Sequence, residues 1–176
     1  GGSSRAVASR QREFAAGRSC ARAALDRIGV SAVAIPIGPD RAPLWPAGAV
    51  GSITHCPGFV GALVAHADAW RGLGFDAEGA GPLGEEIRTM ICSPAELEWI
   101  SVTRSPSNSD WPKVIFSAKE AVHKCIAPIT GTMLDFLDVT ISLDPAHGTF
   151  RARAASTRAE SMPLLGRVTG RFALTG

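Results

Sequence analysis

The sequence predicts an α+β fold, in which helices are combined with small antiparallel sheets. Two observations support this prediction: the chain contains two long helical patterns, and short strand patterns separated by turn residues follow each of them. Of the 176 residues, 45% are hydrophobic and 19% are charged, which is ordinary for a globular protein and argues against disorder. A chain of this length buries roughly 70% of its unfolded surface, enough for one domain or for two small halves that share a core.

A helix is predicted over residues 9–28, where apolar side chains recur on one face and Gly29 ends the pattern. Several arginines lie on this segment, and a solvated basic face is the simplest interpretation of them. The arginines are Arg10, Arg12, Arg18, Arg22 and Arg27.

Residues 35–51 are rich in proline and glycine, which favours short extended pieces joined by turns.

Strand patterns follow this proline-rich stretch. The segments 50–55 and 62–66 flank the turn residues Pro57 and Gly58, and they predict a hairpin. Residues 73–77 predict a further short strand, at whose end two acidic residues lie.

The rest of the chain is predicted to contain three helices and three strands. Ser93 and Glu96 form a capping-box pattern at the start of the second helix. A proline opens the long third helix, and Pro128 is expected to end it. The helices cover residues 83–90, 94–101 and 112–126, and the strands cover residues 134–143, 149–154 and 167–174.

Charge and hydropathy exclude two classes of partner. The formal net charge of +2 is too small to indicate nucleic acid, and no apolar run approaches the roughly 20 residues that cross a bilayer. Four cysteines are spread along the chain without a C-x-x-C pair. Free thiols in a reducing cytosol are therefore expected, with a zinc or disulfide framework as the alternative. We predict a cytoplasmic protein without a nucleic-acid or membrane partner.

A first candidate site contains Asp76 and Glu78. Side chains two residues apart on a strand point to the same side, so the two carboxylates would face one point. They would repel each other unless a cation or a proton lay between them. A hard divalent ion such as Mg²⁺, which prefers oxygen ligands, would relieve the repulsion. The alternative is a pair of exposed acidic residues at the end of a strand.

A second candidate site lies on the long helix. Glu120 and Lys124 are one helical turn apart, and a surface ion pair is the simplest interpretation of them. Much of this helix is apolar, however, and a set of charges that includes Lys119 would be costly on a largely buried helix without a task. If Glu120 meets Asp76 and Glu78, three carboxylates surround one point and suit a metal ion that also binds phosphate.

A third candidate site is the segment around Thr54 and His55, which offers a hydroxyl group and an imidazole beside Gly51. Glycine relieves the local backbone constraint, so such a segment suits a phosphate. Taken alone, His55 is better explained by a structural role.

Four segments carry these candidate residues in one joint pattern. They are R-x-x-E-F-x-x-G-R-x-C-A-R-x-A-L at 10–25, P-x-W-P-x-G-x-V-G-S-x-T-H-C at 43–56, L-G-F-D-A-E at 73–78 and F-S-A-K-E-x-x-x-K at 116–124. In their order and spacing the chain resembles the 4′-phosphopantetheinyl transferases of the monomeric, secondary-metabolism type, such as those serving surfactin and enterobactin assembly.

The resemblance implies two similar halves, each with a helix and a small antiparallel sheet, related by a pseudo-twofold axis. The N-terminal half, residues 5–72, would hold the basic helix and a cradle for coenzyme A phosphates. The C-terminal half, residues 73–176, would hold the metal and catalytic residues, with the active site at the interface.

The resemblance also implies a monomer that transfers 4′-phosphopantetheine from coenzyme A to a serine of an acyl or peptidyl carrier protein, releasing 3′,5′-ADP. The implied ligands of Mg²⁺ or Mn²⁺ are Asp76, Glu78 and Glu120. The implied coenzyme A contacts are Arg10, Arg18, Arg22, Arg41, Thr54, His55, Lys119 and Lys124, and the implied catalytic residues are Glu120 and Lys124.

Some alternatives stay open at this point. Glu120 either activates the carrier serine or serves as a metal ligand alone. The chain departs from the family pattern at His123, where an aromatic residue is usual. Two other functions would use the same residues: a non-catalytic module that binds coenzyme A or a carrier protein, and a metal-dependent phosphohydrolase.

Overall fold

The computed structural model describes residues 2–31, 34–38, 41–105 and 110–174. It divides into two compact units, Gly1–Ala77 and Glu78–Gly176. The first unit combines a long helix with a two-stranded antiparallel sheet, and the second combines several helices with a three-stranded one, so the predicted α+β class is confirmed. The sequence placed the boundary between residues 72 and 73, whereas the contacts of this structure keep residues 73–77 in the first unit.

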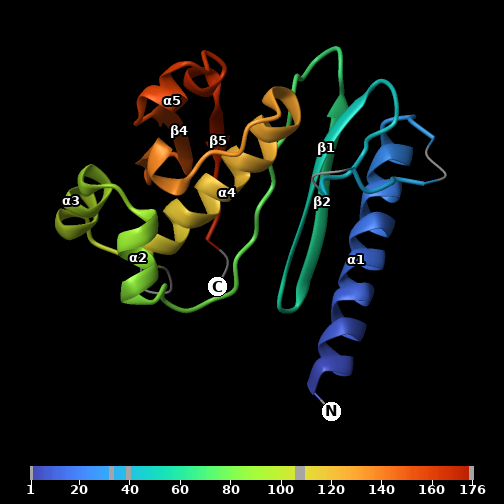
Figure 1. Cartoon of the computed structure of the whole chain (residues 1–176), viewed down its shortest axis with the longest axis horizontal. Helices are drawn as coiled ribbons and strands as arrows, with labels where there is room; N and C mark the ends of the chain where they lie inside the picture. Colours follow the sequence, from blue (N-terminus) through green and yellow to red (C-terminus); the bar gives the residue numbers. More distant parts are fainter. Residues whose placement is uncertain (1, 32–33, 39–40, 106–109, 175–176) are drawn as a thin grey trace. The chain divides into compact units, whose positions relative to one another are not determined.

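In the first unit, helix α1 (Gly2–Arg27) lies along a hairpin of β1 (Ala49–Cys56) and β2 (Phe59–His66) (Figure 1). The strands pair from Ala49 opposite His66 to Cys56 opposite Phe59, so a two-residue turn joins them as predicted. Gly58 in this turn has a φ of 82°, which favours glycine.

Helix α1 packs closely on this hairpin. Ala21 and Leu25 are fully buried and form a small core with Ala49. A Cβ atom added to Gly17 would lie 2.8 Å from Ile53 Cγ2, closer than such atoms approach. The glycine therefore permits the short distance between the basic helix and β1.

The predicted strand at residues 73–77 is wrong. This segment does not form a strand. Its backbone N–H groups bond to side chains of β1 where a strand would bond to the backbone of a neighbouring strand. The Phe75 N–H donates to Ser52 Oγ at 3.0 Å, and the Ala77 N–H donates to Thr54 Oγ1 at 3.1 Å. Two buried hydroxyl groups thus hold an extended segment beside β1.

In the second unit, three helices precede a sheet in the order β3-β4-β5. Ile115, Val122 and Ile126 of α4 are buried in one core with Val139 and Ile141 of β3. The elements are α2 (Glu85–Ile91), α3 (Pro94–Val102), α4 (Trp111–Thr130), η1 (Phe136–Asp138), β3 (Val139–Asp144), β4 (Thr149–Ala154), α5 (Thr157–Glu160), η2 (Leu165–Arg167) and β5 (Thr169–Arg171).

Several predicted boundaries in this unit are wrong. The last predicted strand, residues 167–174, is shortened to β5, because residues 165–167 form a 3₁₀ turn. Pro128 lies inside α4 and does not end it, since a proline removes one backbone donor and the helix continues for two residues. Gly131 ends α4 instead: it adopts a left-handed φ of 66°, and its N–H donates to the Ala127 carbonyl at 2.8 Å. The strand predicted from residue 134 begins at Val139, because residues 136–138 form a 3₁₀ turn.

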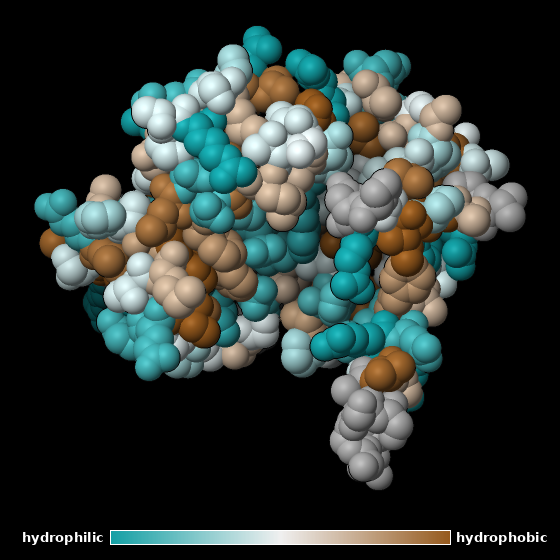
Figure 2. Space-filling view, viewed as in Figure 1, coloured by the Kyte–Doolittle hydropathy of each residue, from teal (hydrophilic) through white to brown (hydrophobic). Residues whose placement is uncertain are grey.

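Exposed apolar side chains are scattered among polar ones on the face drawn in Figure 2. The most exposed large ones are Val102 and Met90, with 79% and 70% of their surface accessible. Isolated exposed apolar residues are common in globular proteins and mark no site by themselves. No helix among the described residues combines the length and the apolar character needed to cross a bilayer.

A buried ion pair joins several elements of the second unit. Lys119 Nζ donates to Glu96 Oε2 at 2.8 Å, to the Ile91 carbonyl at 2.8 Å and to the Phe136 carbonyl at 2.9 Å. The side chains of Lys119 and Glu96 are 0% and 1% exposed. All three ammonium protons are therefore used within the protein.

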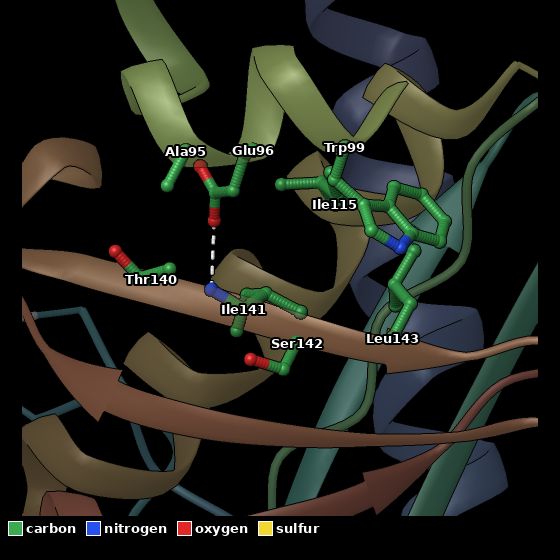
Figure 3. A pocket seen from close by; sticks show the side chains of 8 residues that line it. All are labelled: Ala95, Glu96, Trp99, Ile115, Thr140, Ile141, Ser142 and Leu143. Carbon is green, nitrogen blue, oxygen red and sulfur yellow. Dashed lines mark hydrogen bonds between the residues drawn. The ribbon is translucent and has the colours of Figure 1, made fainter. Parts of the chain in front are cut away.

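The Glu96 carboxylate accepts the remaining hydrogen bonds of this network. Its Oε2 also accepts from the Ser93 N–H at 2.6 Å and completes the predicted capping box. Its Oε1 accepts from the Ile141 N–H of the edge strand β3 at 2.7 Å, across the space between α3 and β3 (Figure 3). Burial lowers the pKa of Lys119, and the hydrogen bond to Glu96 acts in the opposite direction.

Replacing Lys119 with methionine should lower the free energy of unfolding by about 3–5 kcal/mol, because Glu96 would stay buried without its cation. Urea unfolding followed by tryptophan fluorescence measures the change. Lys113→Met on the same helix is the matched control: within the described parts of the chain Lys113 donates to the Gly79 carbonyl at 3.0 Å, so its loss should cost about 1 kcal/mol. Equal effects of the two substitutions would contradict a special role for the buried pair.

Candidate functional site

The candidate residues are divided between the two units, and each set has its own local geometry. The first unit contains Arg10, Arg18, Arg22, Arg41, Thr54, His55 and Asp76, and the second contains Glu78, Lys119, Glu120 and Lys124.

His55 projects from β1 towards helix α1. Its side chain is 58% exposed, and its Nε2 lies 3.6 Å from Glu13 Oε2. Arg10 is exposed and precedes Glu13 by one helical turn, so it belongs to the same stretch of α1. The structure therefore brings His55 beside the basic helix.

Arg18 is the buried member of the basic set, with 8% of its surface exposed. Its guanidinium carbon lies 4.7 Å from the centroid of the Phe14 ring. Its Nε is buried and makes no hydrogen bond among the described residues. Burial lowers the pKa of this group, which nevertheless remains charged. A buried donor without a partner is unfavourable, and an anion would satisfy it.

Two other predicted arginines make local contacts within the described residues. Arg22 is half-buried and donates to Ser19 Oγ at 3.2 Å, within one turn of α1. Arg41 is exposed and adopts a left-handed φ of 67° in a turn where its N–H donates to the Gly38 carbonyl. Each contact thus joins the arginine to a residue three positions before it.

The side chain of Thr54 points into the protein, towards the carboxylate of Asp76. It is 2% exposed, and its hydroxyl donates to Asp76 Oδ1 at 3.5 Å while accepting from the Ala77 N–H. Sequence reasoning expected a phosphate contact here and missed this one. The available signal was the period-two spacing of Ser52 and Thr54, which puts both hydroxyls on one side of β1.

Glu120 and Lys124 are half-buried on α4, one helical turn apart. Lys119 precedes Glu120, but successive helical residues point about 100° apart, and Lys119 faces the core. The prediction that Lys119 neutralises pyrophosphate is contradicted by its geometry, because its three donors are bound to Ile91, Glu96 and Phe136.

The exposed Glu78 begins the second unit. The next residue, Gly79, accepts a hydrogen bond at 3.0 Å from Lys113 Nζ, on the first turns of α4. Lys113 thus ties the chain beside Glu78 to the helix that carries Glu120. Sequence reasoning did not single out this lysine.

His123 occupies the place where the family pattern has an aromatic residue, and it behaves as one. Its ring lies 5.5 Å from that of Phe136, at an interplanar angle of 33°. Burial lowers its pKa, and the nearby Lys119 charge lowers it further, so the ring is mainly neutral at pH 7. Although His123 replaces the aromatic residue of the family pattern, a flat ring still packs against η1.

Neither unit, over the residues described, holds three acidic, histidine or cysteine side chains in an arrangement fit for a metal ion. The predicted ligands are split, since Asp76 belongs to the first unit and Glu78 and Glu120 to the second. A cavity of ≈190 Å³ between α3 and β3 contains none of the predicted residues (Figure 3). Its lining is Ala95, Glu96, Trp99, Ile115, Thr140, Ile141, Ser142 and Leu143.

The four cysteines are free thiols in the structure, as expected. Cys92 is buried, and burial together with the Glu96 charge raises its pKa to about 11. It is therefore a protonated, structural thiol at neutral pH.

Comparison with known proteins agrees with the pattern of motifs. The model of the 4′-phosphopantetheinyl transferase N-terminal domain matches residues 3–65, and the model of the 4′-phosphopantetheinyl transferase superfamily matches residues 72–171.

Three curated relatives are similar over most of the chain. The 4′-phosphopantetheinyl transferase Svp of Streptomyces mobaraensis is 47% identical over 85% of this chain and 61% of its own length. The 4′-phosphopantetheinyl transferase Npt of Nocardia iowensis is 39% identical over 84% of this chain and 69% of its own length. Enterobactin synthase component D of Salmonella typhi is 33% identical over 78% of this chain and 57% of its own length.

The chain spans 57–69% of the length of these relatives. Since the superfamily model covers more than half of the chain, and Npt is matched over more than two thirds of its length, the family is established. The chain belongs to the 4′-phosphopantetheinyl transferase superfamily.

Proposed function

We propose that this chain transfers 4′-phosphopantetheine from coenzyme A to a serine of an acyl or peptidyl carrier protein, with release of 3′,5′-ADP. Membership of the family supports the reaction class. The single structural observation that carries the proposal is the buried Arg18, whose Nε has no partner among the described residues and is suited to an anionic ligand. We further propose a monomeric, cytoplasmic protein.

Coenzyme A would bind through its phosphates to the basic helix and β1. Arg18 would satisfy its buried donor with a phosphate oxygen, and a charge-assisted bond of this kind is stronger than a neutral one. Arg10 and His55 lie on the same stretch of α1 and β1 and would contribute from the exposed side. Arg22, Arg41 and Thr54 were also predicted to contact coenzyme A.

The carboxylates of Asp76, Glu78 and Glu120 would together hold Mg²⁺ or Mn²⁺. Their oxygen chemistry fits a hard divalent cation, and Asp76 is already oriented by a hydrogen bond from Thr54. An ion held by these carboxylates would supply positive charge that stabilises the pyrophosphate. Lys124, one turn from Glu120, would add a second positive charge to the same phosphates.

Glu120 has two possible roles in this arrangement. It would accept the proton of the attacking carrier serine, or it would act as a metal ligand alone. Under either role the protein chiefly positions the two substrates and neutralises charge, which is the usual basis of catalysis in phosphoryl transfer.

Glu120→Gln should reduce carrier modification by at least about 100-fold while the protein stays folded, because the amide keeps the size of the side chain but loses its charge. The assay incubates a carrier protein with coenzyme A and Mg²⁺ and measures by mass spectrometry the gain of one phosphopantetheine group on serine. Glu98→Gln, an exposed glutamate of α3, is the matched control and should retain full activity.

The same assay separates the competing functions. Binding of coenzyme A without any gain of carrier mass would indicate a non-catalytic module. Release of phosphopantetheine in the absence of carrier would indicate a phosphohydrolase. Near-normal transfer by Glu120→Gln would remove this residue from the metal site.

Arg18→Met should weaken coenzyme A binding at least about 10-fold, because a charge-assisted hydrogen bond to phosphate is lost. The melting temperature without ligand should not fall, since the substitution removes a buried donor that has no partner. Calorimetric titration and thermal unfolding measure the two effects, with Arg12→Met on the exposed side of α1 as the control. An unchanged affinity in Arg18→Met would refute the phosphate contact.

A further inference from the structure

Thr54 lies in the family's phosphate-binding motif, yet its hydroxyl points to a carboxylate. We propose that Thr54 is a positioning residue that orients Asp76 for metal binding and is not a contact of coenzyme A. The inference rests on the proposed function, because it takes Asp76 as a metal ligand.

The hydroxyl residues of this strand are buried, and the histidine that follows them is exposed. Thr54 is 2% exposed and Ser52 is 4% exposed, whereas the side chain of the next residue, His55, is 58% exposed. Alternate residues of a strand point to opposite sides. The strand therefore presents His55 outwards to a ligand and turns the Thr54 hydroxyl inwards.

The hydrogen bonds of the Thr54 hydroxyl are directed to the segment that contains Asp76. A hydroxyl group has one proton to donate and two lone pairs with which to accept. Thr54 Oγ1 accepts from the Ala77 N–H at 3.1 Å, and its proton is directed to Asp76 Oδ1 at 3.5 Å. One side chain thus fixes both the backbone after Asp76 and the carboxylate of Asp76.

Ser52 makes a matching contact on the other side of Asp76. Its hydroxyl accepts from the Phe75 N–H at 3.0 Å and donates to the Phe75 carbonyl at 3.5 Å. The backbone is therefore held on both sides of Asp76, by two hydroxyls of the same strand. Segment 75–77 is positioned by side chains of β1, which explains why it needs no place in the sheet.

Such an arrangement favours metal binding. Residues that hydrogen-bond to a metal ligand restrict its orientation, and their loss commonly lowers metal affinity 10–100-fold. The Thr54–Asp76 distance of 3.5 Å is at the long limit for a hydrogen bond. Because the acceptor is a carboxylate whose position the metal would define, we expect this bond to shorten when the ion binds.

The test compares Thr54→Val with Thr54→Ser in the full chain. Valine has nearly the shape of threonine but has no hydroxyl, while serine keeps the hydroxyl and loses a methyl group. Thr140→Val, the same replacement on the half-buried Thr140 of β3, is the control. Electron paramagnetic resonance measures Mn²⁺ binding in the presence of coenzyme A, and calorimetry measures coenzyme A binding in EDTA.

Thr54→Val should weaken Mn²⁺ binding about 10–100-fold, raise the KM for Mg²⁺ more than it lowers kcat, and leave coenzyme A binding in EDTA unchanged. Thr54→Ser and Thr140→Val should bind Mn²⁺ as the parent chain does. If Thr54→Val does not fold, Thr54→Ser decides: a loss of Mn²⁺ affinity in that variant would overturn the proposal.

Two further results would overturn it. Coenzyme A affinity in EDTA that falls as much as Mn²⁺ affinity would make Thr54 a substrate contact. Unchanged Mn²⁺ affinity in Thr54→Val would separate the hydroxyl from the metal. By contrast, a parent chain that binds no Mn²⁺ and modifies no carrier would refute the proposed function itself, independently of any Thr54 variant.

Discussion

The buried pair of Lys119 and Glu96 is the interaction on which the second unit depends. Its five hydrogen bonds connect the end of α2, the first turn of α3, helix α4, the turn η1 and the strand β3. A buried ion pair contributes little to stability compared with apolar packing, but removing one partner is strongly unfavourable. The pair therefore defines the rotation of α4 about its axis. With Lys119 fixed in the core, Glu120 and Lys124 can occupy only the remaining, half-buried sides of the helix.

In the first unit, a buried neutral side chain likewise fixes the position of the residues around it. Thr54 is buried and holds segment 75–77, while its neighbour His55 is exposed beside α1. In both motifs, one of two adjacent residues is held by contacts in the protein interior, and the other lies on a different side of the strand or helix. The geometry of the secondary structure causes this separation: side chains alternate on a strand and are rotated by about 100° per residue on a helix. Residues that hold the structure and residues predicted to act in the reaction are thus neighbours in the sequence.

The sequence was sufficient for most of the elements and for the motifs, but not for the direction of each side chain. The hairpin after residue 49, the capping box at Ser93 and the long helix α4 were predicted, since turn residues, caps and apolar spacing are local signals. The sequence assigned Lys119 to the pyrophosphate of coenzyme A, because a charged residue in a functional motif suggests contact with the substrate. That assignment was wrong. The acceptors of Lys119 lie at Ile91 and Phe136, 28 and 17 residues away, and no local pattern reveals them.

The misassigned segment 73–77 has a similar explanation. Its apolar residues favour a strand, but the partners of Phe75 and Ala77 are hydroxyl groups of β1, a contact that depends on tertiary structure. Pro128 was expected to end α4, whereas the left-handed Gly131 provides a better end three residues later. The convergence of Asp76, Glu78 and Glu120 remains a prediction, based on the family pattern and on the chemistry of carboxylates.

A crystal structure of the chain with coenzyme A and Mn²⁺ tests that convergence most directly, because anomalous scattering locates the ion without assumptions. We predict one manganese peak that is coordinated by carboxylate oxygens of Asp76, Glu78 and Glu120 and lies adjacent to the pyrophosphate. A manganese ion bound elsewhere, or a Glu120 carboxylate too far from it even for a bridging water, would contradict the account.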